Sequence, residues 1–236
     1  MPEPIHLQPT APLAERVLLP GDPGRALRLA QALLSEPRMF NHNRGLWGYT
    51  GETQIDGSPL SIQSTGMGGP SAAIVITELI ALGARRLVRV GTCGALDSEL
   101  PLGALIVATE ALAADGTSRA LGAGERVAAT SRLLGALDAE ARSESAAKAG
   151  PVVSTDVFYD EREGLERKWA AAGALAVEME TATLYALAAR FKIEAAAVLL
   201  VTDLLHPARV RIDPDALQAG ETRLGTVATQ ALGTYG

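Results

Sequence analysis

Cysteine, histidine and aromatic residues are scarce in this sequence. Cys93 is the one cysteine among 236 residues, so an internal disulfide is excluded and a reducing compartment is favoured. The three histidines, His6, His42 and His206, match no zinc-binding spacing, and we expect no structural metal. Phe, Trp and Tyr together make up only 4% of the chain, so Leu, Val, Ile and Ala must fill the core.

Long apolar runs and basic clusters are also missing. No run approaches the ~20 apolar residues of a membrane span, and the opening Met-Pro-Glu-Pro does not resemble a secretory signal. The formal net charge is −6, and no Lys/Arg cluster is interleaved with aromatics, which argues against nucleic acid as a partner. We therefore expect a cytoplasmic protein without membrane or nucleic-acid partners.

Short stretches typical of β-strands alternate with stretches of helical period. This pattern predicts one α/β domain over residues 1–236, a three-layer α/β/α sandwich with helices on both faces of a sheet. Asp56-Gly57, between two alternating runs, predicts a two-residue hairpin turn and therefore a mixed sheet. The expected strands are 16–20, 46–55, 60–65, 86–91, 104–109, 151–155, 175–178 and 196–202. The expected helices are 23–35, 70–82, 128–148, 160–172 and 214–232, with a further helix after 178 and a flexible Ala/Gly-rich loop over 111–127.

Three strand-to-helix junctions carry unusual residues, and ligands of open α/β sheets bind beyond the carboxyl ends of strands. They are GDPGR at 21–25, STGMGGPS at 64–71 and RVGTCG at 89–94. Glycine allows close backbone approach, and N–H groups at a helix start attract anions. The glycines alone are weak evidence, since neither the P-loop nor the dinucleotide-binding pattern is met.

Arg89 lies inside an otherwise apolar strand, where a buried cation needs an anion. The sequence leaves two partners open, an internal Asp or Glu, or a bound phosphate.

Acids stand at two further strand ends. Glu178 and Glu180 flank Met179 where a strand gives way to a helix, and one of them could be a carboxylate stabilised by the helix dipole. Asp203 follows a seven-residue apolar run, and its simplest role would be the N-cap of a helix, although Pro207 follows closely.

Five motifs in register, GDPGR, STGMGGPSAA, RVGTCGA, VEMET and VTD, resemble the purine and uridine nucleoside phosphorylase family of the hexameric type. The resemblance covers residues from about 5 to about 206. It implies the nucleoside phosphorylase fold and phosphorolysis of a purine (deoxy)ribonucleoside to free base and (deoxy)ribose 1-phosphate. It also implies a pentosyltransferase that needs no metal or organic cofactor, with inorganic phosphate as co-substrate.

The resemblance implies a phosphate site made by Gly21, Arg25, Arg89 and Thr92. Arg44 matches an arginine that a neighbouring subunit lends to the same site, although without the family it would be read as a surface arginine beside a hairpin. The implied active form is a homo-oligomer with shared active sites, a hexamer arranged as a trimer of dimers.

The remaining roles are likewise implied by the resemblance. Ribose would contact Met67, Met179 and Glu180, with His6 reaching its 5′ hydroxyl from the neighbouring subunit. The base-binding residues would be Cys93, Gly94, Phe158, Glu178, Thr202 and Asp203.

Asp203 is the expected general acid. A proton delivered to N7 of the departing purine lowers the barrier to cleavage, and an aspartate can deliver it only when protonated. Arg209 and Arg211 are both candidates for the arginine partnered with this aspartate.

Three other functions remain alternatives. Uridine phosphorylase is one, but its uracil-reading Gln-x-Arg is replaced by Arg162 and Gly164. A methylthioadenosine or S-adenosylhomocysteine nucleosidase uses water and needs no phosphate site, so Arg25, Arg44 and Arg89 argue against it. A non-catalytic nucleoside-binding protein would release no base with phosphate.

Overall fold

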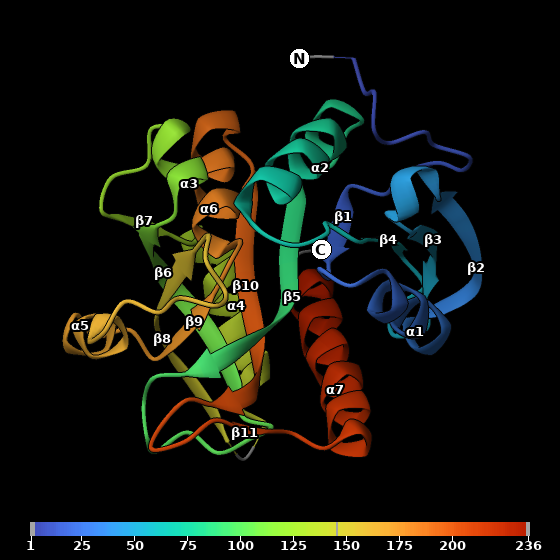
Figure 1. Ribbon diagram of the computed structural model, residues 1–236. Helices are drawn as coiled ribbons and strands as arrows, with labels where there is room; N and C mark the ends of the chain where they lie inside the picture. Colours follow the sequence, from blue (N-terminus) through green and yellow to red (C-terminus); the bar gives the residue numbers. More distant parts are fainter. Residues whose placement is uncertain (1–2, 145, 235–236) are drawn as a thin grey trace.

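A computed structural model describes residues 3–144 and 146–234. Its strands form an 11-stranded mixed sheet in the order β11-β10-β6-β8-β9-β5-β1-β4-β3-β2, with β7 paired to β6 (Figure 1). The strands are β1 Arg16–Leu19, β2 Leu34–Asn41, β3 Gly48–Thr53, β4 Pro59–Gln63, β5 Arg86–Ala95, β6 Leu105–Ala114, β7 Arg126–Ala128, β8 Ala147–Thr155, β9 Ala176–Glu178, β10 Glu194–Leu204 and β11 Val210–Arg211.

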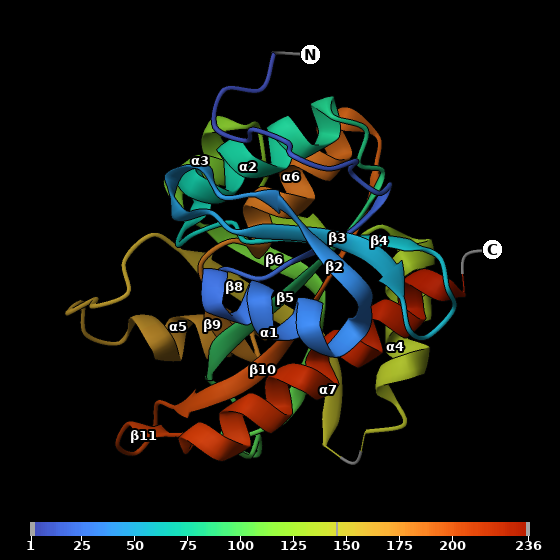
Figure 2. The ribbon, with the colours of Figure 1, turned by 90° about the vertical axis from the view of Figure 1, so that its right-hand side faces the viewer.

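Helices cover both faces of this sheet, as Figure 2 shows. Leu, Ile and Val of α2 and α6 pack on one face, and those of α1, α4 and α7 pack on the other. The two apolar layers confirm the predicted three-layer α/β/α class. The helices are α1 Pro23–Leu33, the short 3-10 turn Asn43–Gly45, α2 Gly69–Ala81, α3 Gly116–Ala120, α4 Ser131–Ala141, α5 Leu165–Ala171, α6 Thr181–Phe191 and α7 Pro214–Gly233.

Part of the sheet closes on itself. Strand β10 pairs with both β5 and β6, so β5, β10, β6, β8 and β9 form a ring. Strands β4, β1, β5 and β10 are parallel neighbours. Their carboxyl ends therefore meet at one edge, which brings together the strand ends that the sequence singled out.

Three helix predictions were too long. The helix expected over 160–172 spans only Leu165–Ala171. The helix expected over 128–148 spans only Ser131–Ala141, because residue 128 belongs to β7 and residues from 147 belong to β8; residue 145 lies outside the described residues. The helix expected over 23–35 ends at Leu33, where β2 begins. Strand β2 was not predicted, because its pairing with β3 is interrupted and Glu36 has a positive φ of 45°, which breaks the alternation of apolar residues.

Two loop predictions also need correction. The loop expected over 111–127 contains the end of β6, helix α3 and the start of β7. The hairpin after β3 exists, but its connection runs over residues 54–58 rather than two residues. The side chain of Asp56 binds the buried Arg16 there, and its Oδ1 also accepts the backbone N–H of Ser58 at 2.9 Å.

Candidate active site

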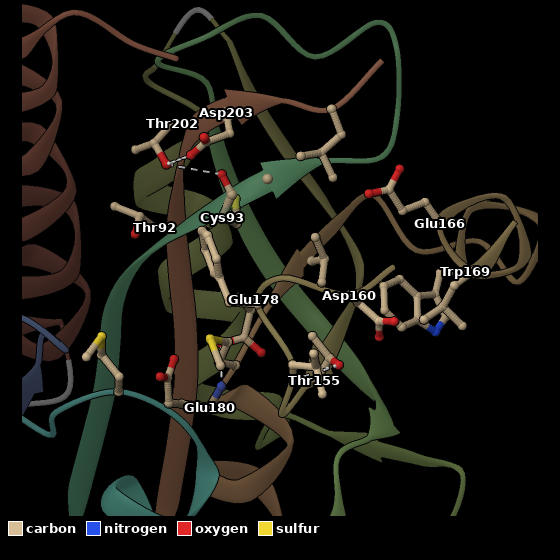
Figure 3. A pocket seen from close by; sticks show the side chains of 18 of the residues that line it. Thr92, Cys93, Thr155, Asp160, Glu166, Trp169, Glu178, Glu180, Thr202 and Asp203 are labelled. Carbon is tan, nitrogen blue, oxygen red and sulfur yellow. Dashed lines mark hydrogen bonds between the residues drawn. The ribbon is translucent and has the colours of Figure 1, made fainter. Parts of the chain in front are cut away.

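A cavity of about 820 Å³ lies at this meeting of strand ends (Figure 3). It collects nearly all of the residues that the sequence singled out. Among its lining residues are Gly21, Arg25, Met67, Arg89, Thr92, Cys93, Gly94, Phe158, Glu178, Met179, Glu180, Thr202 and Asp203.

The turn GDPGR has a local structural reason as well as a place in the cavity. Asp22 is the N-cap of α1, and its carboxylate accepts the backbone N–H groups of Gly24 and Arg25 at 3.0 and 2.8 Å. Gly21 accepts a hydrogen bond from the N–H of Gly66, and a Cβ at Gly21 would lie 3.0 Å from the Gly66 carbonyl oxygen. The close approach of these two turns brings the first two glycine-rich junctions together.

Arg89 is buried, with 6% of its side chain exposed, and it binds two glutamates. Its Nε lies 2.9 Å from Glu178 Oε2, and its Nη2 lies 2.5 Å from Glu180 Oε2. Desolvation alone would lower the pKa of Arg89, but Glu180 and Glu178 together raise it. The internal ion pair is therefore present, and the same guanidinium also lines the cavity.

Gly91 makes room for this arginine. A Cβ built on Gly91 would lie 2.6 Å from Nη2 of Arg89, which is closer than van der Waals contact permits. The glycine in RVGTCG thus lets the Arg89 side chain fold back over its own strand.

Glu178 is enclosed completely, and its carboxylate is engaged on both oxygens. Besides Arg89, it accepts hydrogen bonds from the Ser154 hydroxyl and from the backbone N–H groups of Glu180 and Thr181 at the start of α6. This is the helix-start carboxylate considered from the sequence. It fixes the orientation of Arg89, and its expected contact with the base stays a prediction.

Glu180 joins the turn before α2 to Arg89. Its Oε1 accepts the backbone N–H of Gly68 at 2.5 Å. Burial raises the pKa of Glu180, and the Arg89 cation offsets this only in part. Met179 and the largely exposed Met67 line the cavity beside it.

Asp203 lies inside β10, opposite Arg211 of β11, so the alternative that it caps a helix is wrong. The Thr202 hydroxyl lies 2.9 Å from its Oδ2. Nε of Arg209 lies 2.9 Å from its Oδ1, and Nε of Arg211 lies 3.4 Å from the same oxygen. Both candidate arginines therefore meet Asp203, with Arg209 closer.

Arg209 makes a second contact. Its guanidinium carbon lies 4.8 Å from the ring centroid of Phe158, within cation–π distance. One side chain therefore links the expected acid to the expected aromatic wall.

His6 and Arg44 do not line the cavity. His6 Nδ1 lies 2.7 Å from Glu78 Oε1, and the same carboxylate accepts the backbone N–H groups of Ile5, His6 and Leu7. Desolvation would raise the pKa of Glu78, but His6 and these N–H groups lower it. Arg44 is exposed and has a positive φ of 58°.

One wall of the cavity was missed in the sequence. Its apolar part consists of Leu165, Trp169, Val177 and Leu205, which pack in one cluster. Glu166 and His206 form a 2.9 Å pair at the same wall. The sequence gave no site role to residues 165–169, because a charged helical stretch is read as a solvated surface, whereas α5 in fact packs beside β8 and β9.

In residues 3–144 and 146–234, no group of three or more His, Cys, Asp or Glu side chains gathers to hold a metal ion. Within the same residues, no helix combines the length and apolar character needed to cross a membrane.

Comparison with known proteins decides the family. Residues 15–232 match the model of the phosphorylase superfamily. The chain belongs to this superfamily. The resemblance found in its motifs is thereby confirmed.

Its relatives carry more specific names. A DeoD-type purine nucleoside phosphorylase of Alkaliphilus metalliredigens (strain QYMF) is 42% identical over 197 residues, covering 82% of this chain and 84% of that protein. Another, of Geobacillus kaustophilus (strain HTA426), is 41% identical over 198 residues, covering 82% and 83%.

A solved structure shares the whole fold of this superfamily member. It is the uridine phosphorylase of Vibrio fischeri ES114 in complex with 6-hydroxy-1-naphthoic acid, with a TM-score of 0.85 and 27% identity. The match covers 94% of this chain and 92% of the other.

Proposed function

We propose that this member of the phosphorylase superfamily is a purine nucleoside phosphorylase, a pentosyltransferase that moves a (deoxy)ribosyl group from a purine to phosphate. One observation carries the proposal. A single cavity holds buried arginines beside N–H groups, a carboxylate that can accept hydroxyls, and an acid beside an aromatic ring. The names of the relatives at 42% and 41% identity support the same activity.

Phosphate is assigned to Gly21, Arg25, Arg89 and Thr92. Arginine fits the planar arrangement of two phosphate oxygens, and charge-assisted hydrogen bonds are the strong ones in a desolvated site. Glu180, which binds Arg89, would then accept the 2′ and 3′ hydroxyls of ribose next to the phosphate. The sugar becomes cationic as the glycosidic bond breaks, and both anions stabilise it.

Asp203 is assigned to the base. A phosphate oxygen bonds to C1′ as the C1′–N9 bond breaks, the bonding electrons pass to the purine, and Asp203 gives its proton to N7. Arg209 holds Oδ1 of Asp203 and covers one side of Phe158, which leaves the other side of that ring for the base.

The active form is inferred to be a homo-oligomer with shared sites, a hexamer built as a trimer of dimers. Both arginines assigned to phosphate are already paired with glutamate, Arg25 with Glu221 and Arg89 with Glu178 and Glu180. A doubly charged phosphate needs a further cation, and Arg44 of a neighbouring copy would provide it. His6, held on α2 by Glu78, would reach a neighbouring ribose in the same way.

Phosphate is the expected co-substrate, no metal or organic cofactor is expected, and the cytoplasmic location stays a prediction. The test measures base release from adenosine, inosine and uridine with and without phosphate, in the presence of EDTA. Phosphate-dependent release from the purine nucleosides is expected. Equal release without phosphate would instead indicate a nucleosidase, and no release would indicate a binding protein.

Uridine phosphorylase is the second candidate, because the solved neighbour of the same fold is one. Against it, Arg162 is bound to Asp160, and Gly164 has no side chain to read uracil. Uridine is therefore expected to be a poor substrate, and the same substrate panel decides.

A further inference from the structure

We propose that Glu221 of α7 is a positioning residue of the phosphate site, acting through Arg25. The inference rests on the proposed function, since it concerns the co-substrate of that reaction. Within the described residues, α7 contributes no side chain to the cavity lining, so Glu221 would act from outside the site.

The contacts of Glu221 are close and directional. It is buried, with 2% of its surface exposed, and its Oε1 lies 2.8 Å from Nε of Arg25. Its Oε2 accepts Nε and Nη2 of Arg28 at 3.0 and 2.6 Å. Glu221 thus links Arg28 to Arg25, and each of its carboxylate oxygens binds one of the two guanidinium groups.

These contacts leave part of the Arg25 guanidinium available for a ligand. Its Nε is bound by Glu221, and its Nη1 lies 3.4 Å from the carbonyl oxygen of Val90. The remaining donors belong to a side chain that lines the cavity. An arginine held at two points loses less rotamer entropy when it binds an anion than a mobile one does.

Two observations place the charge of Arg25 within the site. Gly21 and Asp22, which directly precede the helix of Arg25, line the same cavity. Burial raises the pKa of Glu180, the carboxylate assigned to ribose, and the cations of Arg89 and, to a smaller extent, Arg25 oppose this rise.

A purely structural role predicts something different. A buried ion pair contributes little to net stability, but removing one partner leaves the other charge uncompensated. If Glu221 only stabilised the fold, its loss would lower the amount of active enzyme without changing the affinity for either substrate. A positioning role predicts a change confined to phosphate.

The experiment compares the full-length protein with Glu221→Gln and Glu221→Asp. Arg223→Gln, on the same helix as Glu221, is the matched control, since it breaks the exposed pair of Arg223 with Glu144. Initial rates give kcat and the KM values for phosphate and adenosine. Titration calorimetry with inorganic phosphate gives a Kd that does not depend on catalysis, and melting curves show how much protein is folded.

The KM and Kd for phosphate are expected to rise about tenfold or more in Glu221→Gln, the effect of losing one hydrogen bond to a charged group. Glu221→Asp keeps the charge but shortens the side chain and should lie between Glu221→Gln and wild type. The KM for adenosine should stay within about twofold in all variants, since Arg25 is assigned to phosphate alone and Glu221 does not line the cavity. Arg223→Gln should match wild type.

Unchanged or tighter phosphate binding in Glu221→Gln would overturn the inference, as would an equal rise in both KM values. If Glu221→Gln does not fold, Glu221→Asp decides by the same phosphate values. Wild-type protein that binds phosphate but releases no base would refute the proposed function, while the Kd comparison would still test Glu221. Wild-type protein that binds no phosphate would refute the inference itself.

Discussion

Arg89 shows at the scale of one residue how a single charge organises the site. Its position inside an apolar strand was visible in the sequence, and the two open partners were an internal acid and a phosphate. The structure supplies the acids, because Glu178 and Glu180 lie beside it. The sequence could not choose these glutamates as its partners, since they follow it by about ninety residues and meet it only through β9 and the start of α6.

Replacing Gly91 by Ala is expected to impair phosphate use. The new methyl group would lie 2.6 Å from Arg89 Nη2, so the guanidinium must move away from Glu180. We expect the KM for phosphate to rise at least about tenfold, as for the loss of a charge-assisted hydrogen bond, with a smaller change for adenosine. Gly135→Ala, on a helix with open space around the glycine, is the control. Phosphate kinetics like those of wild type in Gly91→Ala would contradict this geometry.

Asp203→Asn is expected to lower kcat/KM for adenosine by about 10²–10⁴-fold, the usual contribution of general acid catalysis. The carboxamide keeps the size of the side chain and the position beside Thr202 and Arg209, but it has no carboxylic proton to give. Asp215→Asn, an exposed exchange of the same kind, is the control. Adenosine cleaved as well by Asp203→Asn as by wild type, or uridine as the best wild-type substrate, would exclude the assigned role.

At the scale of single elements, regular apolar patterns were reliable guides. The strands that carry the site follow continuous apolar runs, and α1 and α2 begin with proline near the first helical position, so the sequence located them well. Strand β2 and the α5 wall were missed for a common reason. Charged and polar residues interrupt the apolar pattern of both segments. The pattern of each segment alone does not show that β2 pairs with β3 or that α5 packs against β8 and β9.

The hairpin after β3 supports a prediction about pH. Arg16 of β1 is buried and binds Asp56 Oδ2 at 2.9 Å, the carbonyl of Pro59 at 3.1 Å and the carbonyl of Leu232 at 3.4 Å. The hydrogen bond from Arg16 lowers the pKa of Asp56, against the opposing effect of burial. The guanidinium of Arg16, paired with the Asp56 carboxylate, thus links β1, the hairpin and the end of α7.

Asp56→Asn should lower the free energy of unfolding by about 1–3 kcal/mol at pH 7, because it leaves the Arg16 cation without its anion. The folded pKa of Asp56 lies below the unfolded value of about 3.9, so its stabilisation is full above that pH and is lost as pH falls through the folded pKa. The difference in Tm between wild type and Asp56→Asn should therefore shrink below about pH 4. Glu52→Gln, exposed on the same hairpin, is the control. A constant difference in Tm down to acid pH would contradict the proposed linkage.

At the scale of the whole molecule, the closed ring of strands explains why motifs far apart in the chain share one cavity. The order of elements predicted an α/β sandwich, but the pairing of β10 with both β5 and β6 was not foreseeable, since each strand pattern is compatible with several neighbours. This pairing places Asp203 beside Gly94. Asp203 and Gly94, both of which line the cavity, therefore come from neighbouring strands.

The proposed homo-oligomer accounts for the separation of Arg44 and His6 from the cavity. Both are tied to the surface formed by the N-terminal segment, α2 and the turn before β3, and neither lines the cavity of its own chain. With Arg25 and Arg89 already matched by glutamates, a site completed by a second copy resolves both observations. The prediction is that neither Arg44→Ala nor Arg89→Ala is active alone, because each abolishes a cation of every site in its own homo-oligomer.

Mixing the two variants should restore activity. A hybrid site can combine the intact cavity of an Arg44→Ala chain with the intact Arg44 of an Arg89→Ala chain, whereas its counterpart lacks both arginines. Mixed oligomers form from the purified variants only if their subunits exchange. Co-expression of the two chains forms mixed oligomers without such exchange. For a dimer pair mixed at equal amounts, about a quarter of the sites combine both intact arginines by random association, so activity well above either single variant is expected.

The control is Arg38→Ala, which changes an exposed arginine of β2. Mixed with Arg89→Ala, it shows how far the inactive Arg89→Ala chain dilutes the activity of a chain whose own site is intact. A fully active monomer in light scattering, or hybrids no more active than the separate variants, would show that each chain builds its site alone.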